Sequence, residues 1–122
     1  MTTFTINQEQ HTVNFSKKAQ EQGIKGFHID ATRWFQRSYG NTYHTVRVIA
    51  ILEDGKLGDV VAHSERMSYG YGDQYLQTAC ELLMEAGLID CTNEYAFAGW
   101  QVREAMNIQH VAQDVQRKRD MI

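Results

Sequence analysis

The most constraining feature of this chain is a run of three β-rich segments, with a turn signal after each of the first two. Residues 26–36, 42–52 and 57–65 are rich in β-branched and aromatic side chains, which favour strands. Asp54-Gly55 separates the second and third segments, and this dipeptide signals a two-residue hairpin because both turn positions need a positive φ. With residues 38–41 as the first loop, the pattern predicts a three-stranded antiparallel meander.

The two turns predict which side chains share a face of this sheet. They pair Leu52 with Leu57 and Phe35 with His44, and successive side chains along a strand point to opposite faces. One face is apolar and is predicted to form the core: Phe27, Ile29, Ala31, Phe35, Val46, Val48, Ala50, Leu52, Leu57 and Val61. The other face is mixed: His28, Asp30, Thr32, Trp34, Tyr43, Thr45, Arg47, Ile49, Ile51 and Val60.

The segment before the meander carries signals for both a strand and a helix. Phe4 to Ile6 alternate like a short strand. Asn7 stands three residues before Gln10, which is a weak capping-box pattern, and Gly23 suits the end of a helix. We therefore expect a helix within about residues 8–22.

Two further helices are predicted after the meander. Asp73 suits the N-cap of the first, because its carboxylate can accept from free amides and favours the positive helix end. Gly87 suits the C-terminal end of that helix, and its apolar stripe is Leu76, Ala79, Cys80, Leu83 and Ala86. From Asn93 onward the chain is predicted to be helical, on the spacing of Ala105, Ile108, Ala112, Val115 and Ile122.

These elements predict an α+β fold of α-β-β-β-α order with a helical C-terminal tail. The 122 residues fit one domain, with its core in about residues 8–90 and its tail in about 93–122. There is no apolar run near the ~20 residues that cross a bilayer, and the first residues lack a signal-peptide pattern. Since Cys80 and Cys91 do not make a disulfide framework, we expect a reduced cytoplasmic protein without a membrane segment.

The charge distribution is uneven along the chain. Residues 1–52 hold six basic against three acidic side chains, residues 53–104 hold three against ten, and the last eighteen hold three against two. Such a chain can associate with itself, basic part to acidic part, and we expect a homo-oligomer. Nucleic acid is disfavoured as a partner, because the acidic part repels phosphate.

The mixed face of the sheet is the first candidate site. It offers Trp34, Tyr43 and Arg47 beside aliphatic side chains, and these three residue types often dominate interface energetics. The sequence predicts a protein partner at this face. An alternative stays open, in which the C-terminal helix covers the face as ordinary core.

The segment from Tyr69 to Tyr75 is the second candidate site. Gly70 and Gly72 precede a predicted helix start, whose free amides can hold a phosphate, and Tyr69 and Tyr71 could stack on a base. Arg33 and Arg37 would lie near the sheet edge, so a small nucleotide-like ligand or RNA is an alternative partner. Asp73 would occupy the anion position itself, and the plainer interpretation is a glycine loop that permits a tight turn.

His44, His63 and Glu65 form a third candidate, for a metal site or a histidine-dependent enzyme. In the predicted register His44 faces Glu65, with His63 diagonal to it, and such groups can bind a metal or share a proton. A hydrogen-bonded pair of sheet-edge histidines is the favoured interpretation. Neither cysteine has an evident activating partner, so the sequence points to no catalytic residue and no cofactor.

The predicted order over about residues 8–87 is similar to the double-stranded RNA-binding domain, and Gly70-Tyr71-Gly72 lies where that family has its glycines. That family places a lysine cluster at the start of its last helix to contact phosphates. This chain has Asp73-Gln74-Tyr75-Leu76-Gln77 at those positions. The departure removes the main source of affinity for duplex RNA.

Three other segments look like parts of uncharacterised phage and prophage accessory proteins: Arg33-Trp34-Phe35, residues 39–44 and residues 69–75. The resemblance implies a small intracellular protein that binds a host component, and some such proteins counter host defence. We therefore expect a non-enzymatic binding protein in the bacterial cytosol, which occupies a host partner or sequesters a ligand.

Overall fold

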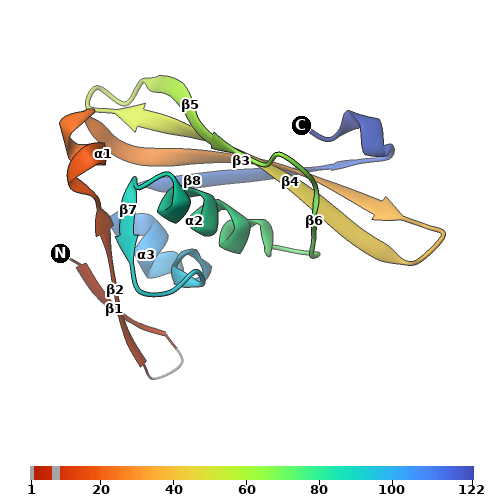
Figure 1. The fold of residues 1–122 in the computed structure, drawn as a ribbon, viewed down its shortest axis with the longest axis horizontal. Helices are drawn as coiled ribbons and strands as arrows, with labels where there is room; N and C mark the ends of the chain where they lie inside the picture. Colours follow the sequence, from red (N-terminus) through yellow and green to blue (C-terminus); the bar gives the residue numbers. More distant parts are fainter. Residues whose placement is uncertain (1, 7–8) are drawn as a thin grey trace.

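Two β-sheets and a helical layer make up the fold (Figure 1). The computed structural model describes the backbone of residues 2–6 and 9–122, and the side chains of residues 12–122. The strands are β1 (Thr2–Ile6), β2 (Glu9–Phe15), β3 (Ile24–Gln36), β4 (Asn41–Leu52), β5 (Leu57–His63), β6 (Ser68–Tyr69), β7 (Ile89–Cys91) and β8 (Ile108–Val115). The helices are α1 (Lys17–Glu21), α2 (Tyr75–Glu85) and α3 (Trp100–Ala105), with the 3-10 helices η1 (Ala96–Ala98) and η2 (Lys118–Asp120). The predicted α+β class is confirmed.

The large sheet has the strand order β5-β4-β3-β8, and β6 pairs with the first part of β4. The loop of the β3–β4 hairpin spans residues 37–40, and the Gly40 amide donates to the Gln36 carbonyl at 2.8 Å. His44 therefore lies opposite Arg33, two residues from the predicted register. A shift of two residues leaves each side chain on its predicted face.

The turn between β4 and β5 lies at the predicted place but has a different form. Gly55 has a φ of +80°, whereas Asp54 is not among the residues with positive φ. The Leu52 amide donates to the Lys56 carbonyl, and the Gly55 amide donates to the Leu52 carbonyl. This is the three-residue loop with one left-handed glycine, not the predicted two-residue turn. A bulge between the pairs at Val48 and Ile49 shifts the register again.

The core lies between the large sheet and α2. β3 and β4 contribute Phe27, Ile29, Val46 and Val48, and α2 contributes Leu76, Ala79, Cys80 and Leu83. Two predicted core residues are wrong, because Phe35 is 53% and Leu57 is 56% exposed. Phe35 lies where the β3–β4 hairpin extends past α2 (Figure 1), and Leu57 follows the turn between β4 and β5.

Helix α2 ends as predicted and begins differently. Gly87 has a φ of +72°, and the amides of Gly87 and Leu88 donate to the carbonyls of Met84 and Leu83. This pair of hydrogen bonds is the pattern that ends a helix at a left-handed glycine. Asp73 is not the N-cap, because the helix begins two residues later and its cap residue, Gln74, makes no capping bond with its side chain.

The N-terminal region is mostly strand. β2 occupies much of the predicted helix and pairs with β1 and β7, so the helix expected within about 8–22 is reduced to α1. Ser16 caps it by accepting from the Ala19 amide at 3.1 Å, and Gly23 follows it with a φ of +73°. The capping-box prediction at Asn7 lies outside the described residues.

The C-terminal tail is helical in part. α3 ends at Ala105, Asn107 adopts a left-handed φ of +54°, and β8 then runs parallel to β3. The helical prediction for residues 108–115 is therefore wrong. It rested on the spacing of residues such as Ile108 and Ala112, which are four residues apart. That spacing places two side chains on one face of a helix and equally on one face of a strand.

Candidate functional site

The two faces of the large sheet are covered very differently. α2 and α3 lie on one side, whereas η2 and the C-terminus lie on the other (Figure 1). We call the side of the large sheet that faces away from α2 the open face. Side chains of β3 and β4 lie on it, and the pairing of β8 with β3 places side chains of β8 there as well. Its members are His28, Asp30, Thr32, Trp34, Tyr43, Thr45, Arg47, Ile49, Gln109, Val111, Gln113 and Val115. Among the described residues, no α-helix covers this face.

Three aromatic side chains form a row across the open face, and we call them the aromatic row. Trp34, Tyr43 and Tyr69 lie directly opposite one another on β3, β4 and β6. The rings of Trp34 and Tyr43 stack with centroids 6.0 Å apart, and those of Tyr43 and Tyr69 meet edge to face at 5.8 Å. Tyr69 is 65% exposed. Strand pairing therefore holds a rigid aromatic surface toward solvent.

Sequence reasoning placed Trp34 and Tyr43 on one face but assigned Tyr69 to a separate loop. The structure joins Tyr69 to the other two because β6 takes over the edge of β4 where β5 has turned away. A two-residue strand has no periodicity of its own, so nothing local in the sequence indicates this pairing.

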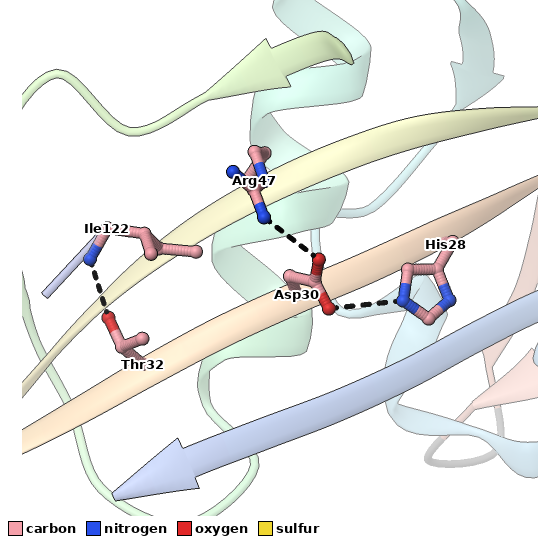
Figure 2. A network of polar contacts seen from close by, with 5 residues as sticks. All are labelled: His28, Asp30, Thr32, Arg47 and Ile122. Carbon is pink, nitrogen blue, oxygen red and sulfur yellow. Dashed lines mark hydrogen bonds and ion pairs between the residues drawn. The ribbon is translucent and has the colours of Figure 1, made fainter. Parts of the chain in front are cut away.

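Arg47 lies further along the open face in a polar network (Figure 2). Its Nη2 donates to Asp30 Oδ2 at 3.3 Å, and His28 Nε2 lies 3.1 Å from Asp30 Oδ1. Arg47 is thus an oriented and partly neutralised cation, separated from the aromatic row by the Thr32–Thr45 pair.

The C-terminal segment crosses the open face between Arg47 and the aromatic row. The Ile122 amide donates to Thr32 Oγ1 at 3.1 Å (Figure 2), and the Thr32 hydroxyl is paired with that of Thr45 at 2.6 Å. Both threonines are buried. The alternative of a covering C-terminal helix is therefore replaced by a short segment that leaves Tyr69 exposed.

A cavity of about 460 Å³ lies beside this segment. Its walls include two methionines and two cations, with one carboxylate: Thr45, Ser64, Glu65, Arg66, Met67, Lys118, Met121 and Ile122. Methionine walls adapt to varied partners, so the cavity extends the contact surface next to the aromatic row.

The tyrosine-glycine loop is largely occupied by its own contacts. The Gly70 amide donates to the Thr42 carbonyl at 3.0 Å, and the Tyr71 amide donates to Gln74 Oε1 at 3.0 Å. Tyr75 is buried, with its hydroxyl 2.6 Å from His110 Nδ1. Tyr71 and Asp73 remain exposed. Two loop amides are thus unavailable for a phosphate.

Arg33 lies on the face opposite Trp34, where it ties the loop to β8. Its Nε donates to Asp114 Oδ1 at 2.7 Å, and its Nη1 donates to the Gly72 carbonyl at 3.0 Å. These contacts position the loop and occupy two of the five guanidinium N–H groups.

The predicted histidine cluster is not assembled. His44 is buried, with Nδ1 3.2 Å from the Gly70 carbonyl and Nε2 2.6 Å from Thr78 Oγ1. His63 pairs with Arg47 and is exposed, and Glu65 is exposed in the following loop. The prediction that His44 faces Glu65 is wrong, and within the described part of the chain no group of three His, Cys, Asp or Glu is placed to hold a metal.

The structure also brings together two cysteines that sequence reasoning left apart. Both sulfurs lie near the Asn93 carbonyl oxygen, Cys80 Sγ at 3.9 Å and Cys91 Sγ at 2.9 Å. The neighbouring Cys80 lowers the pKa of Cys91 to about 6, while Cys91 and burial raise the pKa of Cys80. Their spacing matches no known motif, and the contact depends on how β7 packs against α2.

The comparisons with known proteins add no relative to this description. No family model, curated protein or solved structure matches the chain. Among the described residues, no helix has the length and apolar content needed to span a membrane.

Proposed function

We propose that this chain is a non-enzymatic binding protein whose aromatic row is the central contact with a protein partner. The observation that carries the proposal is the row itself, in which the ring of Tyr43 contacts those of Trp34 and Tyr69 on the side of the sheet away from α2 and α3. Aromatic side chains in a packed cluster are the commonest interface hot spots.

The row is suited to binding because it is already ordered. Strand pairing and ring contacts fix Trp34 and Tyr43, so association costs little side-chain entropy. Their hydroxyl and indole N–H groups add directed hydrogen bonds at the rim of an apolar patch. The partner that fits is a protein segment with an apolar anchor for the row.

The cavity beside the row suggests the charge of that partner. Among the side chains that line it, the two cations of Arg66 and Lys118 outnumber the one carboxylate, that of Glu65. An acidic group at the rim of the partner would complement this excess. In line with the phage-protein resemblance, we propose that the partner is a component of the bacterial host cytosol.

The decisive experiment compares two matched pairs of substitutions. Trp34→Ala with Tyr69→Ala removes two members of the row, and Trp100→Ala with Tyr95→Ala removes an exposed tryptophan and tyrosine outside the row. Wild-type chain is used to capture and identify the partner from expressing cells. The purified partner is then titrated against each variant by calorimetry.

We expect the row variant to lose affinity by tens-fold or more, since each hot-spot residue contributes about 2 kcal/mol or more, and the control variant to bind like wild type. Circular dichroism checks that both variants are folded. If the row variant binds as tightly as the wild type, or if both variants lose affinity to the same extent, the aromatic row is not the contact.

A second candidate function is nucleotide or RNA binding, which the same row could support by base stacking. The occupied loop amides argue against the phosphate site first expected for it. A ligand at 100 times its dissociation constant would add ~2.7 kcal/mol of stability. A rise in melting temperature with mononucleotides or a short single-stranded RNA would favour this function over a protein partner.

A further inference from the structure

Cys80 and Cys91 lie side by side at the junction of α2 and β7. Cys80 is fully buried on the core side of α2, and Cys91 is the partly exposed last residue of β7. Their sulfur atoms lie 3.9 Å and 2.9 Å from one acceptor, the Asn93 carbonyl oxygen. Since both sulfurs lie within hydrogen-bonding distance of this one oxygen, the two thiols are close neighbours.

We propose that Cys91 is an oxidation site for hydrogen peroxide and that Cys80 resolves the oxidised sulfur into an intramolecular disulfide. This inference is independent of the aromatic row, because the thiols lie on the α2 side of the sheet.

The chemistry takes two balanced steps. The Cys91 thiolate attacks one peroxide oxygen, the O–O bond breaks, and the departing hydroxide takes a proton to become water, which leaves a sulfenic acid. The Cys80 sulfur then attacks the Cys91 sulfur, the S–O bond breaks, and the hydroxyl leaves as water with the Cys80 proton. In sum, two thiols and one peroxide give one disulfide and two waters.

The surroundings assign the two roles. Cys91 has the exposure needed to meet the oxidant, and its sulfur accepts from the Asn93 amide at 3.4 Å. The neighbouring Cys80 thiol favours the Cys91 thiolate and lowers its pKa, whereas burial and the nearby Glu94 carboxylate disfavour the thiolate. Low pKa, exposure and an adjacent second thiol are the properties of peroxide-sensitive cysteines.

The disulfide would join α2 to β7, which lie next to one another in Figure 1. β7 is also an edge of the small sheet, paired with β2. The bond would therefore fix the small sheet to the helical layer and leave the aromatic row unchanged.

The test uses the full reduced chain with equimolar hydrogen peroxide at neutral pH. We expect the intact mass to fall by about 2 Da, as two thiol hydrogens are lost, and peptide mapping to find Cys80 joined to Cys91. The Cys80→Ser variant should instead hold a sulfenic acid on Cys91, which dimedone traps. The Cys91→Ser variant should stay reduced under the same conditions.

Three results would overturn the proposal. The first is a wild-type chain that stays reduced while a small-molecule thiol in the same tube is oxidised. The second is over-oxidation of Cys91 to the sulfinic acid without any disulfide. The third is a disulfide that forms no faster in the folded chain than in the chain unfolded by guanidinium, because the packed geometry would then contribute nothing.

Discussion

His44 has both ring nitrogens engaged inside the core, which fixes the tautomer of its neutral ring. A carbonyl oxygen can only accept, so Nδ1 carries the hydrogen toward Gly70, and Nε2 then accepts from the Thr78 hydroxyl. A proton added to Nε2 would reverse the second bond, with Nε2 donating to Thr78 Oγ1, and would bury a charge. Burial accordingly lowers the pKa of His44 below its ordinary value of 6.5.

This histidine predicts a loss of stability in mild acid. The unfolded chain binds a proton at His44 more tightly than the folded chain does. The contribution of His44 to the free energy of unfolding is therefore complete above pH 6.5 and falls as the pH drops below that value. We expect the melting temperature to decrease steadily from neutral pH toward the folded-state pKa. Differential scanning calorimetry across this range measures the effect.

The control for this prediction is His44→Gln, which does not titrate. We expect this variant to be less stable at neutral pH but flatter with pH than the wild type. A part of the slope should remain, because burial also lowers the pKa of His110. Parallel pH profiles of wild type and variant would show that His44 is not the source.

The predictability of individual residues depends on how local their partners are. The faces of Trp34 and Tyr43 could be predicted, because alternation along a strand survives a register error of two residues. The contact between Cys80 and Cys91 could not, because it is set by the packing of α2 on β7. His63 was misplaced because a single bulge reverses the face of the residues beyond it.

At the scale of elements, the junction of β8 with β3 depends on a close approach at Gly26. A Cβ atom built on Gly26 would lie within 2.9 Å of three Asn107 atoms, its carbonyl oxygen among them. That carbonyl also accepts from the Phe27 amide at 3.2 Å. An added methyl group must therefore displace backbone where β8 begins.

We expect Gly26→Ala to destabilise the fold by about 1–3 kcal/mol, the usual cost of overpacking, as measured by urea unfolding. Gly99→Ala is the matched control, since its nearest neighbour would be 4.0 Å away and its φ of -88° suits alanine. The control should change stability by no more than about 0.5 kcal/mol. Equal effects in the two variants would contradict the steric explanation.

Elements with strong local signals could be predicted and elements stabilised by distant partners could not. β3, β4 and α2 carry alternation, turns and a C-terminal glycine that agree with one another. β8 obtains its strand form from pairing with β3, and β2 pairs with the distant β7 as well as with β1, partners that no local signal in these segments indicates. The Asp54-Gly55 dipeptide predicted the position of the turn but not the number of residues in its loop, because the observed loop needs a positive φ only at Gly55.

At the scale of the whole molecule, η2 presents Lys118 and Arg119 on the open side of the large sheet (Figure 1). The turn between β4 and β5 carries Glu53 and Asp54, and Lys56 forms an ion pair with Asp54 at 3.6 Å. The expected self-association, basic part to acidic part, would then use η2 as its basic contact. Such a head-to-tail contact does not close by two-fold symmetry.

Head-to-tail association of this kind must be sensitive to salt, because the Debye length falls from about 30 Å at about 0.01 M to about 3 Å at about 1 M. We expect light scattering to detect oligomers at low salt and monomers at high salt. Lys118→Glu with Arg119→Glu should abolish the oligomers. Lys17→Glu with Lys25→Glu makes the same change in net charge at the other end of the sheet, in and after α1, and should preserve them. Oligomers that persist at high salt would place the contact on an apolar surface instead, and the Trp34→Ala, Tyr69→Ala variant would then identify the open face as that surface.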